Sequence, residues 1–203
     1  MIARDDVETA TLRPLVEKCF ATPPPRGVTN IFGKPGVIRR DALWFGRYDA
    51  SGFFPLYRTF GYGDPGTTTG VRDAVPPARM PQWMEDVLDD LSRRHNLPVL
   101  NHVVLHRYVD GGDTIGMHHD KTMDLHQSST IVSLSLGGSR DFRLGPSTFP
   151  VHDGDVVLIP YETNRLMKHG VPPRANASTR YSLTARTVHT YSNGLTHRVV
   201  AAL

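Results

Sequence analysis

The sequence predicts a mainly β protein with flanking helices, in which two sheets face each other as a double-stranded β-helix (jelly roll). Three observations lead to this fold class. Short runs rich in Val, Ile, Leu, Thr and aromatic residues recur after Pro98. Turn-forming pairs such as Gly137-Gly138 and Asp153-Gly154 separate these runs, as in sandwiches and barrels. Before Pro98 there is one long amphipathic helix, which we expect to pack across an outer face.

Two helices are predicted before the strands begin. A short one covers about residues 12–20, has an apolar side, and ends before three consecutive prolines at 23–25. Residues 26–79 are rich in Gly, Pro and aromatic residues without clear periodicity, which indicates short strands and long loops. Pro81 then opens the long helix. Its apolar stripe consists of Trp83, Met84, Val87, Leu88 and Leu91.

The strands are predicted where β-branched and aliphatic residues cluster over a few positions. Such runs are bounded by turn residues and are too short for helices. They fall at residues 103–108, 129–136, 141–145, 155–160 and 180–188. Five short strands at this spacing are the framework of the predicted jelly roll.

Composition is that of a globular domain. The chain has 203 residues, of which 39% are hydrophobic and 21% charged, with a net charge of +3. The mild positive charge is compatible with a polyanionic partner but does not require one. Cys19 is the only cysteine, so no intrachain disulfide can form. With no apolar run of about 20 residues and no secretion signal, we expect no membrane partner and a cytoplasmic, reducing location.

The strongest chemical signal lies in residues 116–124, GMHHDKTMD. In an extended segment His118 and Asp120 point to the same face, while His119 points away. His169, just after the predicted strand 155–160, is the best third ligand. Two imidazoles and one carboxylate on one face of an octahedron leave three sites open, which is typical of ferrous oxygenases. Taken alone, however, a His-x-Asp triplet also arises by chance in a chain with ten histidines.

The final predicted strand adds a second signal. Arg180 and Arg186 are six residues apart, so in a strand both lie on one face, together with Ser182 and Thr184. A buried guanidinium without an anionic partner is costly, so this face requires an anion. A dicarboxylate co-substrate would supply it, because Arg forks match carboxylates. Surface salt bridges are the alternative explanation for either arginine alone.

Together, seven stretches resemble the AlkB family of Fe(II)/2-oxoglutarate dioxygenases and occur in the family's order. They are ALWFG (42–46), LHRY (105–108), MHHDK (117–121), IVSLSLG (131–137), GDVVLIP (154–160), KHGVP (168–172) and RYSLTAR (180–186). The resemblance implies that His118, Asp120 and His169 are the catalytic metal ligands. It also implies iron(II) as the metal, 2-oxoglutarate as co-substrate, and O2.

The resemblance also assigns residues to the co-substrate. Tyr108 and Arg180 would hold the distal carboxylate of 2-oxoglutarate, and Arg186 would lie near the carboxylate that chelates the metal. Two further co-substrate positions depart from the family pattern: His106 and Ser182 stand where well-studied members carry Asn. These changes leave the iron chemistry intact.

By the same resemblance, residues 1–80 hold the N-terminal helix and a substrate-lid region. Residues 81–203 hold a helix plus the jelly-roll catalytic core, within one structural domain. Eight aromatic residues fall between Trp44 and Tyr62, in the lid that grips the family's target. Trp44 and Tyr57 are candidate contacts because aromatic faces stack on nucleobases, although such rings can equally be core beneath a lid.

The predicted substrate is an alkylated nucleobase in DNA or RNA, and Arg39, Arg40, Arg47 and Arg58 are candidates for contacts with phosphates. Thr122 is a further substrate candidate, but it stands where nucleobase repair enzymes often carry an acidic residue. Together with His106 it favours the alternative, a small-molecule substrate derived from a nucleoside or an amino acid. A third alternative is a jelly-roll binding module without metal, against which the complete ligand set argues. The oligomeric state stays open.

Overall fold

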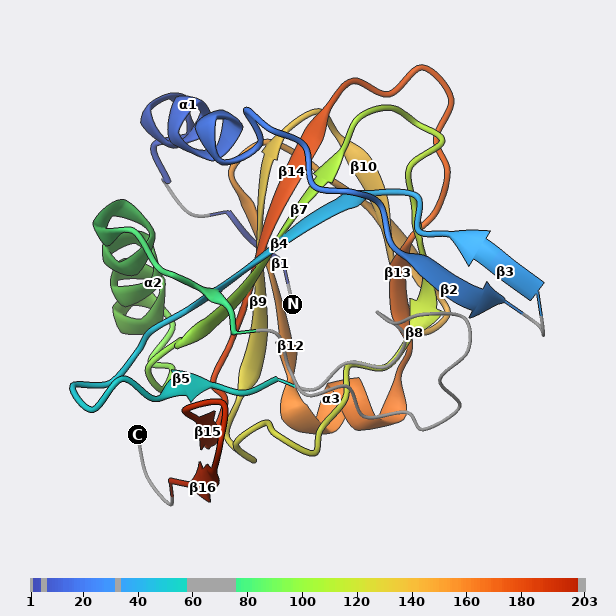
Figure 1. The fold of residues 1–203 in the computed structure, drawn as a ribbon. Helices are drawn as coiled ribbons and strands as arrows, with labels where there is room; N and C mark the ends of the chain where they lie inside the picture. Colours follow the sequence, from blue (N-terminus) through green and yellow to red (C-terminus); the bar gives the residue numbers. More distant parts are fainter. Residues whose placement is uncertain (1, 5–6, 32–33, 58–75, 201–203) are drawn as a thin grey trace.

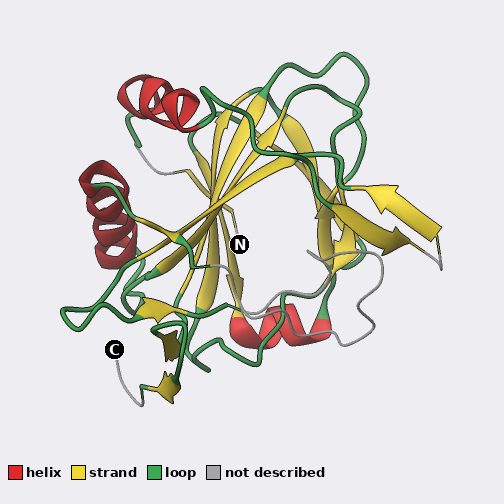
Figure 2. Cartoon of the chain, in the orientation of Figure 1, coloured by secondary structure: helices red, strands yellow, loops and turns green. Residues whose placement is uncertain are grey.

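Two β-sheets lie face to face, and two helices cover the outer face of the larger sheet (Figure 1). The computed structural model describes residues 2–4, 7–31, 34–57 and 76–200. Strands dominate the described residues and helices are few (Figure 2), so the predicted fold class, a mainly β jelly roll, is confirmed. No helix in these ranges is long and apolar enough to span a bilayer.

The larger sheet has seven strands, in the order β1-β12-β9-β14-β7-β4-β6. They are β1 (Ile2–Arg4), β12 (Asp155–Pro160), β9 (Thr130–Gly137), β14 (Arg180–Arg186), β7 (His102–Tyr108), β4 (Asp41–Gly46) and β6 (Ala78–Arg79). All neighbours are antiparallel except the parallel pair β4–β6. Because β4 pairs with β7 from end to end, the N-terminal part of the chain contributes a strand to the central sheet.

The smaller sheet has four antiparallel strands in the order β11-β10-β13-β8. They are β11 (Ser147–Val151), β10 (Arg140–Leu144), β13 (His169–Val171) and β8 (Ile115–His118). Two minor sheets lie outside the sandwich. They comprise the hairpin β2 (Val28–Ile31) and β3 (Lys34–Val37), and the group β5 (Phe54–Pro55), β15 (Thr190–Ser192) and β16 (His197–Val199).

The outer face of the larger sheet packs against α1 (Thr9–Cys19) and α2 (Gln82–Arg94). The predicted stripe of α2 is confirmed: Met84, Leu88 and Leu91 are fully buried, and Trp83 and Val87 pack at the edge of the same cluster. Burying each large aliphatic side chain stabilises the fold by about 1.5–3 kcal/mol. Helix α1 begins three residues earlier than predicted, so Pro14 lies in its second turn instead of its first, where it has no N–H to donate to the preceding turn.

The inner face of the larger sheet is polar along its central strand β14, in contrast to the outer face. Side chains alternate along a strand, so Leu183 and Ala185 of β14 face the helices while Ser182 and Thr184 face the other sheet. A second core cluster between the sheets contains apolar residues of both, such as Phe142 of the smaller sheet and Ile131 of β9. The space between the two sheets is therefore polar along β14 and apolar around it.

A short helix, α3 (Tyr161–Leu166), connects β12 to β13 where the sequence predicted only a turn. It begins directly after Pro160 and lies at one end of the sandwich (Figure 1). Six residues with one buried member are too few for a periodic apolar pattern, which explains why it was not predicted.

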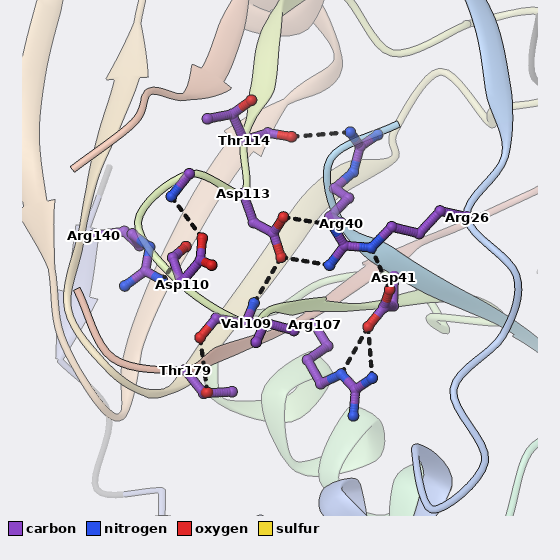
Figure 3. A network of polar contacts seen from close by, with 11 residues as sticks. Arg26, Arg40, Asp41, Arg107, Val109, Asp110, Asp113, Thr114, Arg140 and Thr179 are labelled. Carbon is purple, nitrogen blue, oxygen red and sulfur yellow. Dashed lines mark hydrogen bonds and ion pairs between the residues drawn. The ribbon is translucent and has the colours of Figure 1, made fainter. Parts of the chain in front are cut away.

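A chain of ion pairs fixes the loop between β7 and β8 to the N-terminal segment (Figure 3). Arg26 forms a double hydrogen bond with Asp113, at 2.7 Å for each, and a third bond with Asp41 at 2.8 Å. Arg107 of β7 binds the other oxygen of Asp41 at 2.7 Å. Asp113 also accepts the backbone N–H of Val109. The loop that leads into β8 is therefore held to β4 and β7.

Candidate iron and 2-oxoglutarate site

A cavity of about 50 Å³ lies between the two sheets, lined by residues of both. One end holds His118, Asp120 and His169. The inner face of β14 forms a wall with Arg180, Ser182, Thr184 and Arg186, the four residues that strand alternation predicted to share a face. Apolar side chains line the rest of the cavity, among them Ile131 and Ile159 of the larger sheet and Phe142 and Val171 of the smaller sheet.

The three predicted metal ligands come together at the end of this cavity. The Nε2 atoms of His118 and His169 lie 3.3 Å and 3.8 Å from Oδ1 of Asp120. One ligand atom from each residue lies within 4.8 Å of the other two. Ligands about 2.1 Å from one ion and at right angles to each other are about 3 Å apart, so this set fits a single metal ion. Two histidines and one carboxylate are the donor set of non-haem iron(II).

Both histidines present a nitrogen suited to a metal. His118 Nδ1 lies 2.9 Å from the carbonyl oxygen of Gly116, which can only accept, so Nδ1 carries the proton and Nε2 keeps its lone pair. The ring of His169 lies parallel to Phe142, with 12° between the planes. Burial lowers the pKa of His169 to about 4, despite the opposing effect of Asp120, so this imidazole is neutral at pH 7.

Arg186 holds the oxygen of Asp120 that does not face the histidines. Its Nε and Nη2 donate to Oδ2 at 2.7 Å and 2.6 Å. Burial alone would raise the pKa of Asp120, but Arg186 and the two histidines more than offset burial and lower it well below its usual range. The carboxylate is therefore charged, with Oδ1 directed toward the imidazoles and Oδ2 occupied by Arg186.

Strand pairing brings the two histidines side by side. His169 of β13 is directly opposite His118 of β8, and their ring centroids are 4.4 Å apart. The strands approach so closely that a Cβ on Gly170 would lie 2.8 Å from the carbonyl oxygen of Ile115, which only glycine avoids. Asp120 itself lies beyond the end of β8, although its spacing predicted that it shares an extended segment with His118.

Arg180 is a buried cation directed into the cavity. It is 1% exposed, and Nη2 donates to Ser135 at 2.7 Å. Its Nε and Nη1 have no hydrogen-bond partner among the described residues. Burial lowers the pKa of Arg180. Two buried donors without acceptors fit a carboxylate, as the distal end of 2-oxoglutarate would provide. Tyr108 lies beside it, with its ring centroid 5.3 Å from the guanidinium carbon.

The two departures from the family pattern both line the cavity. Ser182 belongs to a chain of hydroxyls, with contacts of 2.9 Å to Ser133 and 3.1 Å to Thr184. His106 is 8% exposed, and burial, followed by the charge of Arg40, lowers its pKa well below the ordinary value. A neutral imidazole can still donate or accept one hydrogen bond, as the amide of Asn does.

The four candidate substrate residues lie in different settings. Trp44 is half-buried on β4, on the same face as the inner residues of β7 and β14. Tyr57 is 8% exposed and stacks under Arg186, with 4.9 Å from its ring centroid to the guanidinium carbon. Arg40 donates to the carbonyl oxygen of Thr114 at 3.2 Å. Thr122 is half-buried two residues after Asp120.

Other members of the aromatic and arginine-rich segment serve the fold. Phe45 belongs to the outer core under the helices. Arg47 binds Asp89 of α2 at 2.7 Å and so holds this helix to β4. Tyr48 donates to the carbonyl oxygen of Pro77. Three further candidates, Arg58, Phe60 and Tyr62, lie outside the described residues.

One residue near the metal ligands was not identified from the sequence, and another was identified only as a candidate substrate contact. The buried side chain of Asn164 binds the backbone of Asp120, 44 residues away. Tyr57 contacts Arg186 from the N-terminal part of the chain. No spacing rule connects such distant residues, although an Asn within a short segment before a metal-binding His is a usable signal, because a buried amide needs partners.

The fold and part of the sequence match known proteins. A solved structure, "The structure of OsALKBH1", superposes with a TM-score of 0.61 at 19% identity and covers 92% of this chain and 97% of that chain. Human "DNA oxidative demethylase ALKBH2" is 29% identical over 143 residues, which are 63% of this chain and 54% of that protein. The Bos taurus protein of the same name is 30% identical over 148 residues, which are 63% and 51%.

This chain thus spans about half the length of the curated relatives it matches. The sequence profile of the 2OG-Fe(II) oxygenase superfamily matches residues 61–186, a range that contains all three metal-ligand candidates and both cavity arginines. The matched range and the cavity geometry agree, and the chain belongs to the 2OG-Fe(II) oxygenase superfamily, with the AlkB-like proteins among its relatives.

Proposed function

We propose that this chain is an iron(II)- and 2-oxoglutarate-dependent dioxygenase that oxidatively demethylates an alkylated base in nucleic acid. The observation that carries the proposal is one cavity with a His-Asp-His set at one end and two unpartnered donors of Arg180 on its wall. The first suits iron and the second suits a carboxylate. In the reaction, the N-methyl substrate, O2 and 2-oxoglutarate give the demethylated base, formaldehyde, succinate and CO2.

When bound, the iron and 2-oxoglutarate would activate O2, which supplies the oxidising power for attack on a C–H bond. The chain's own residues bind and orient the metal and the co-substrate. Asp120 contributes a charged carboxylate held in place by Arg186, and His118 and His169 contribute the Nε2 atoms that face it. Arg180 fixes the far end of the co-substrate. Apolar side chains of both sheets, among them Ile131 and Phe142, limit water in the cavity.

The relatives support the substrate class. The two mammalian proteins are named DNA oxidative demethylases, and this chain carries a net charge of +3, which suits a polyanion. Trp44, on the inner side of the sheet, provides an aromatic face for stacking. Thr122 can accept a hydrogen bond without a charge, so we expect weaker discrimination among bases than a carboxylate would give.

The test is succinate and formaldehyde release by the purified chain with iron(II) and 2-oxoglutarate. The panel holds matched methylated and unmethylated DNA and RNA oligonucleotides, methylated nucleosides and N-methyl amino acids. We expect release only with methylated oligonucleotides, in equal amounts of the two products. Binding measured by anisotropy at two salt concentrations should weaken steeply with salt, because phosphate contacts release counterions.

Two outcomes would contradict the proposed substrate. One is turnover of a methylated nucleoside or amino acid together with no detectable binding of any oligonucleotide at low salt. That result would instead support the small-molecule alternative, which the uncharged Thr122 favours. The other is equal turnover of methylated and unmethylated oligonucleotides, which would exclude the methyl group as the point of attack.

A further inference from the structure

Asn164 is a fully buried polar residue in the middle of α3. Its side-chain oxygen accepts the backbone N–H of Asp120 at 2.9 Å, and its side-chain nitrogen donates to the backbone carbonyl of Asp120 at 3.0 Å. One amide thus satisfies both backbone groups of the same residue. The carbonyl oxygen of Asn164 in turn lies 2.5 Å from Nδ1 of His119, so the α3 segment contacts two consecutive residues of the His-His-Asp sequence.

Asp120 needs such a contact because no strand ladder holds it. The last paired residue of β8 is His118, opposite His169, and residues 119–121 have no regular secondary structure. In a ladder the backbone N–H and C=O of Asp120 would bind a neighbouring strand; here the amide of Asn164 takes the place of that strand. The contact with His119 draws that imidazole toward α3 and away from the ligand set.

We propose that Asn164 is a positioning residue of the metal site, which fixes the backbone of Asp120 so that Oδ1 faces His118 and His169. The inference rests on the metal site of the proposed function, but it concerns binding of the metal and not the choice of substrate. Its physical basis is preorganisation, because a ligand fixed before binding does not lose conformational freedom when the metal arrives. Removal of the amide therefore lowers the affinity for the metal by more than the accompanying loss of fold stability explains.

The chain contains a matched control for this claim. Asn101 is equally buried and makes the same pair of bonds with another backbone: it donates to the carbonyl of Val188 at 2.8 Å and accepts the N–H of Val188 at 2.8 Å. Val188 is not among the metal-ligand candidates. Loss of either amide leaves two buried backbone groups without their partner, and Asn101 also loses its bond to the hydroxyl of Tyr191 at 2.9 Å, so the control disturbs folding at least as much.

The experiment compares Asn164→Ala, Asn164→Ser and Asn101→Ala in the full chain, with Co(II) as the probe. Co(II) affinity and the visible absorption bands of the bound ion are measured well below each variant's melting temperature, and unfolding is measured separately without metal. We expect Asn164→Ala to weaken Co(II) binding at least tenfold and to change the absorption bands. The Co(II) affinity of Asn101→Ala should stay within about twofold of wild type. Its free energy of unfolding should nevertheless fall at least as much as that of Asn164→Ala. The smaller Asn164→Ser change provides a folded variant if Asn164→Ala is unstable.

Two results would overturn the inference. One is unchanged Co(II) affinity and absorption bands in both Asn164 variants. The other is an equal loss of affinity in Asn101→Ala, which would make the effect a general consequence of lost stability. Failure of the proposed function is distinguishable from both, because wild type would then bind Co(II) no better than a His118→Ala/His169→Ala double variant.

Discussion

The two carboxylate oxygens of Asp120 contact different partners, and this arrangement defines the geometry of the metal site. Oδ2 accepts two hydrogen bonds from Arg186, while Oδ1 faces the two imidazoles. The guanidinium of Arg186 is in turn covered by the ring of Tyr57. Burial would lower the pKa of Arg186, yet the charge of Asp120 raises it, so the pair stays ionised. A charged carboxylate is thus ready for a metal without a change in protonation.

Each of His118→Ala, Asp120→Ala and His169→Ala should abolish metal binding, whereas His119→Ala should keep at least part of it. The reason is that three ligand atoms converge while the ring of His119 is bonded to the carbonyl of Asn164. Isothermal titration with Mn(II) measures this directly. Loss of metal binding in His119→Ala, with intact binding in His118→Ala, would show that the ligand assignment is wrong.

Arg180→Ala should strongly weaken 2-oxoglutarate binding, by about 3–5 kcal/mol if the co-substrate carboxylate becomes a buried charge without its partner. Arg180→Lys should restore only part of the affinity, because an ammonium lacks the planar fork that leaves two donors available in the cavity. The Michaelis constant for 2-oxoglutarate is the readout. An unchanged constant in Arg180→Ala would remove Arg180 from the co-substrate site.

The alternation of side chains along a β-strand explains which single residues of the site could be predicted from the sequence. It placed Arg180, Ser182 and Thr184 on one face from their spacing alone, and the cavity lining agrees. The fixing of Asp120 could not be predicted in this way, since it depends on an amide from a helix 44 residues further along the chain. Contacts of that kind follow from tertiary packing, which local spacing does not encode.

At the scale of elements, long periodic segments were predictable and short ones were not. Helix α2 carries its stripe of apolar residues over thirteen positions, and β14 alternates over seven. By contrast, α3 and β8 span six and four residues, too few for a period to be recognised. Yet β8 carries His118, and its position depends on the preceding loop, which the ion pairs of Arg26 hold to the larger sheet.

Arg26→Ala should destabilise the protein by about 1–3 kcal/mol, less than a fully buried pair would, because Arg26 is itself 32% exposed at its side chain. The reason is that Asp113, which is nearly fully buried, loses both side-chain bonds and keeps only the N–H of Val109. Urea unfolding measures the change.

The matched control is Arg93→Ala, which breaks an ion pair with Asp90 at the surface of α2, where Arg93 is 75% exposed. Exposed pairs contribute little, so its change should stay below about 0.5 kcal/mol. Equal effects of the two substitutions would mean that the pairs around Arg26 act as ordinary surface contacts and do not hold the loop before β8.

At the scale of the whole molecule, the polar interior makes stability depend on pH. Burial, followed by the charge of Arg186, lowers the pKa of His102 to about 3, and burial lowers that of His169 to about 4. In the unfolded chain a histidine has a pKa of about 6.5. Between these values the unfolded chain binds more protons than the folded one, so stability is retained above pH 6.5 and falls as the pH decreases.

The metal-free protein should therefore lose about 1.4 kcal/mol per pH unit for each such histidine between about pH 6 and pH 4.5. His102→Gln should reduce the slope of the unfolding free energy against pH by the contribution of one proton, which is about 1.4 kcal/mol per pH unit. His197→Gln, at an exposed position of β16, should leave the slope as it is in wild type. Chemical denaturation across this pH range is the measurement. A slope that is the same in wild type and His102→Gln would contradict the assignment of a buried neutral imidazole.

One cavity joins a metal held by His118, Asp120 and His169 to a 2-oxoacid held by Arg180. Succinate formation with a methylated oligonucleotide, measured against added iron(II), tests this arrangement. We expect succinate to rise with iron until one equivalent per chain, to be matched by formaldehyde, and to be absent in His169→Ala. Succinate formed equally well by His169→Ala, or none formed by iron-loaded wild type with any methylated substrate, would contradict it.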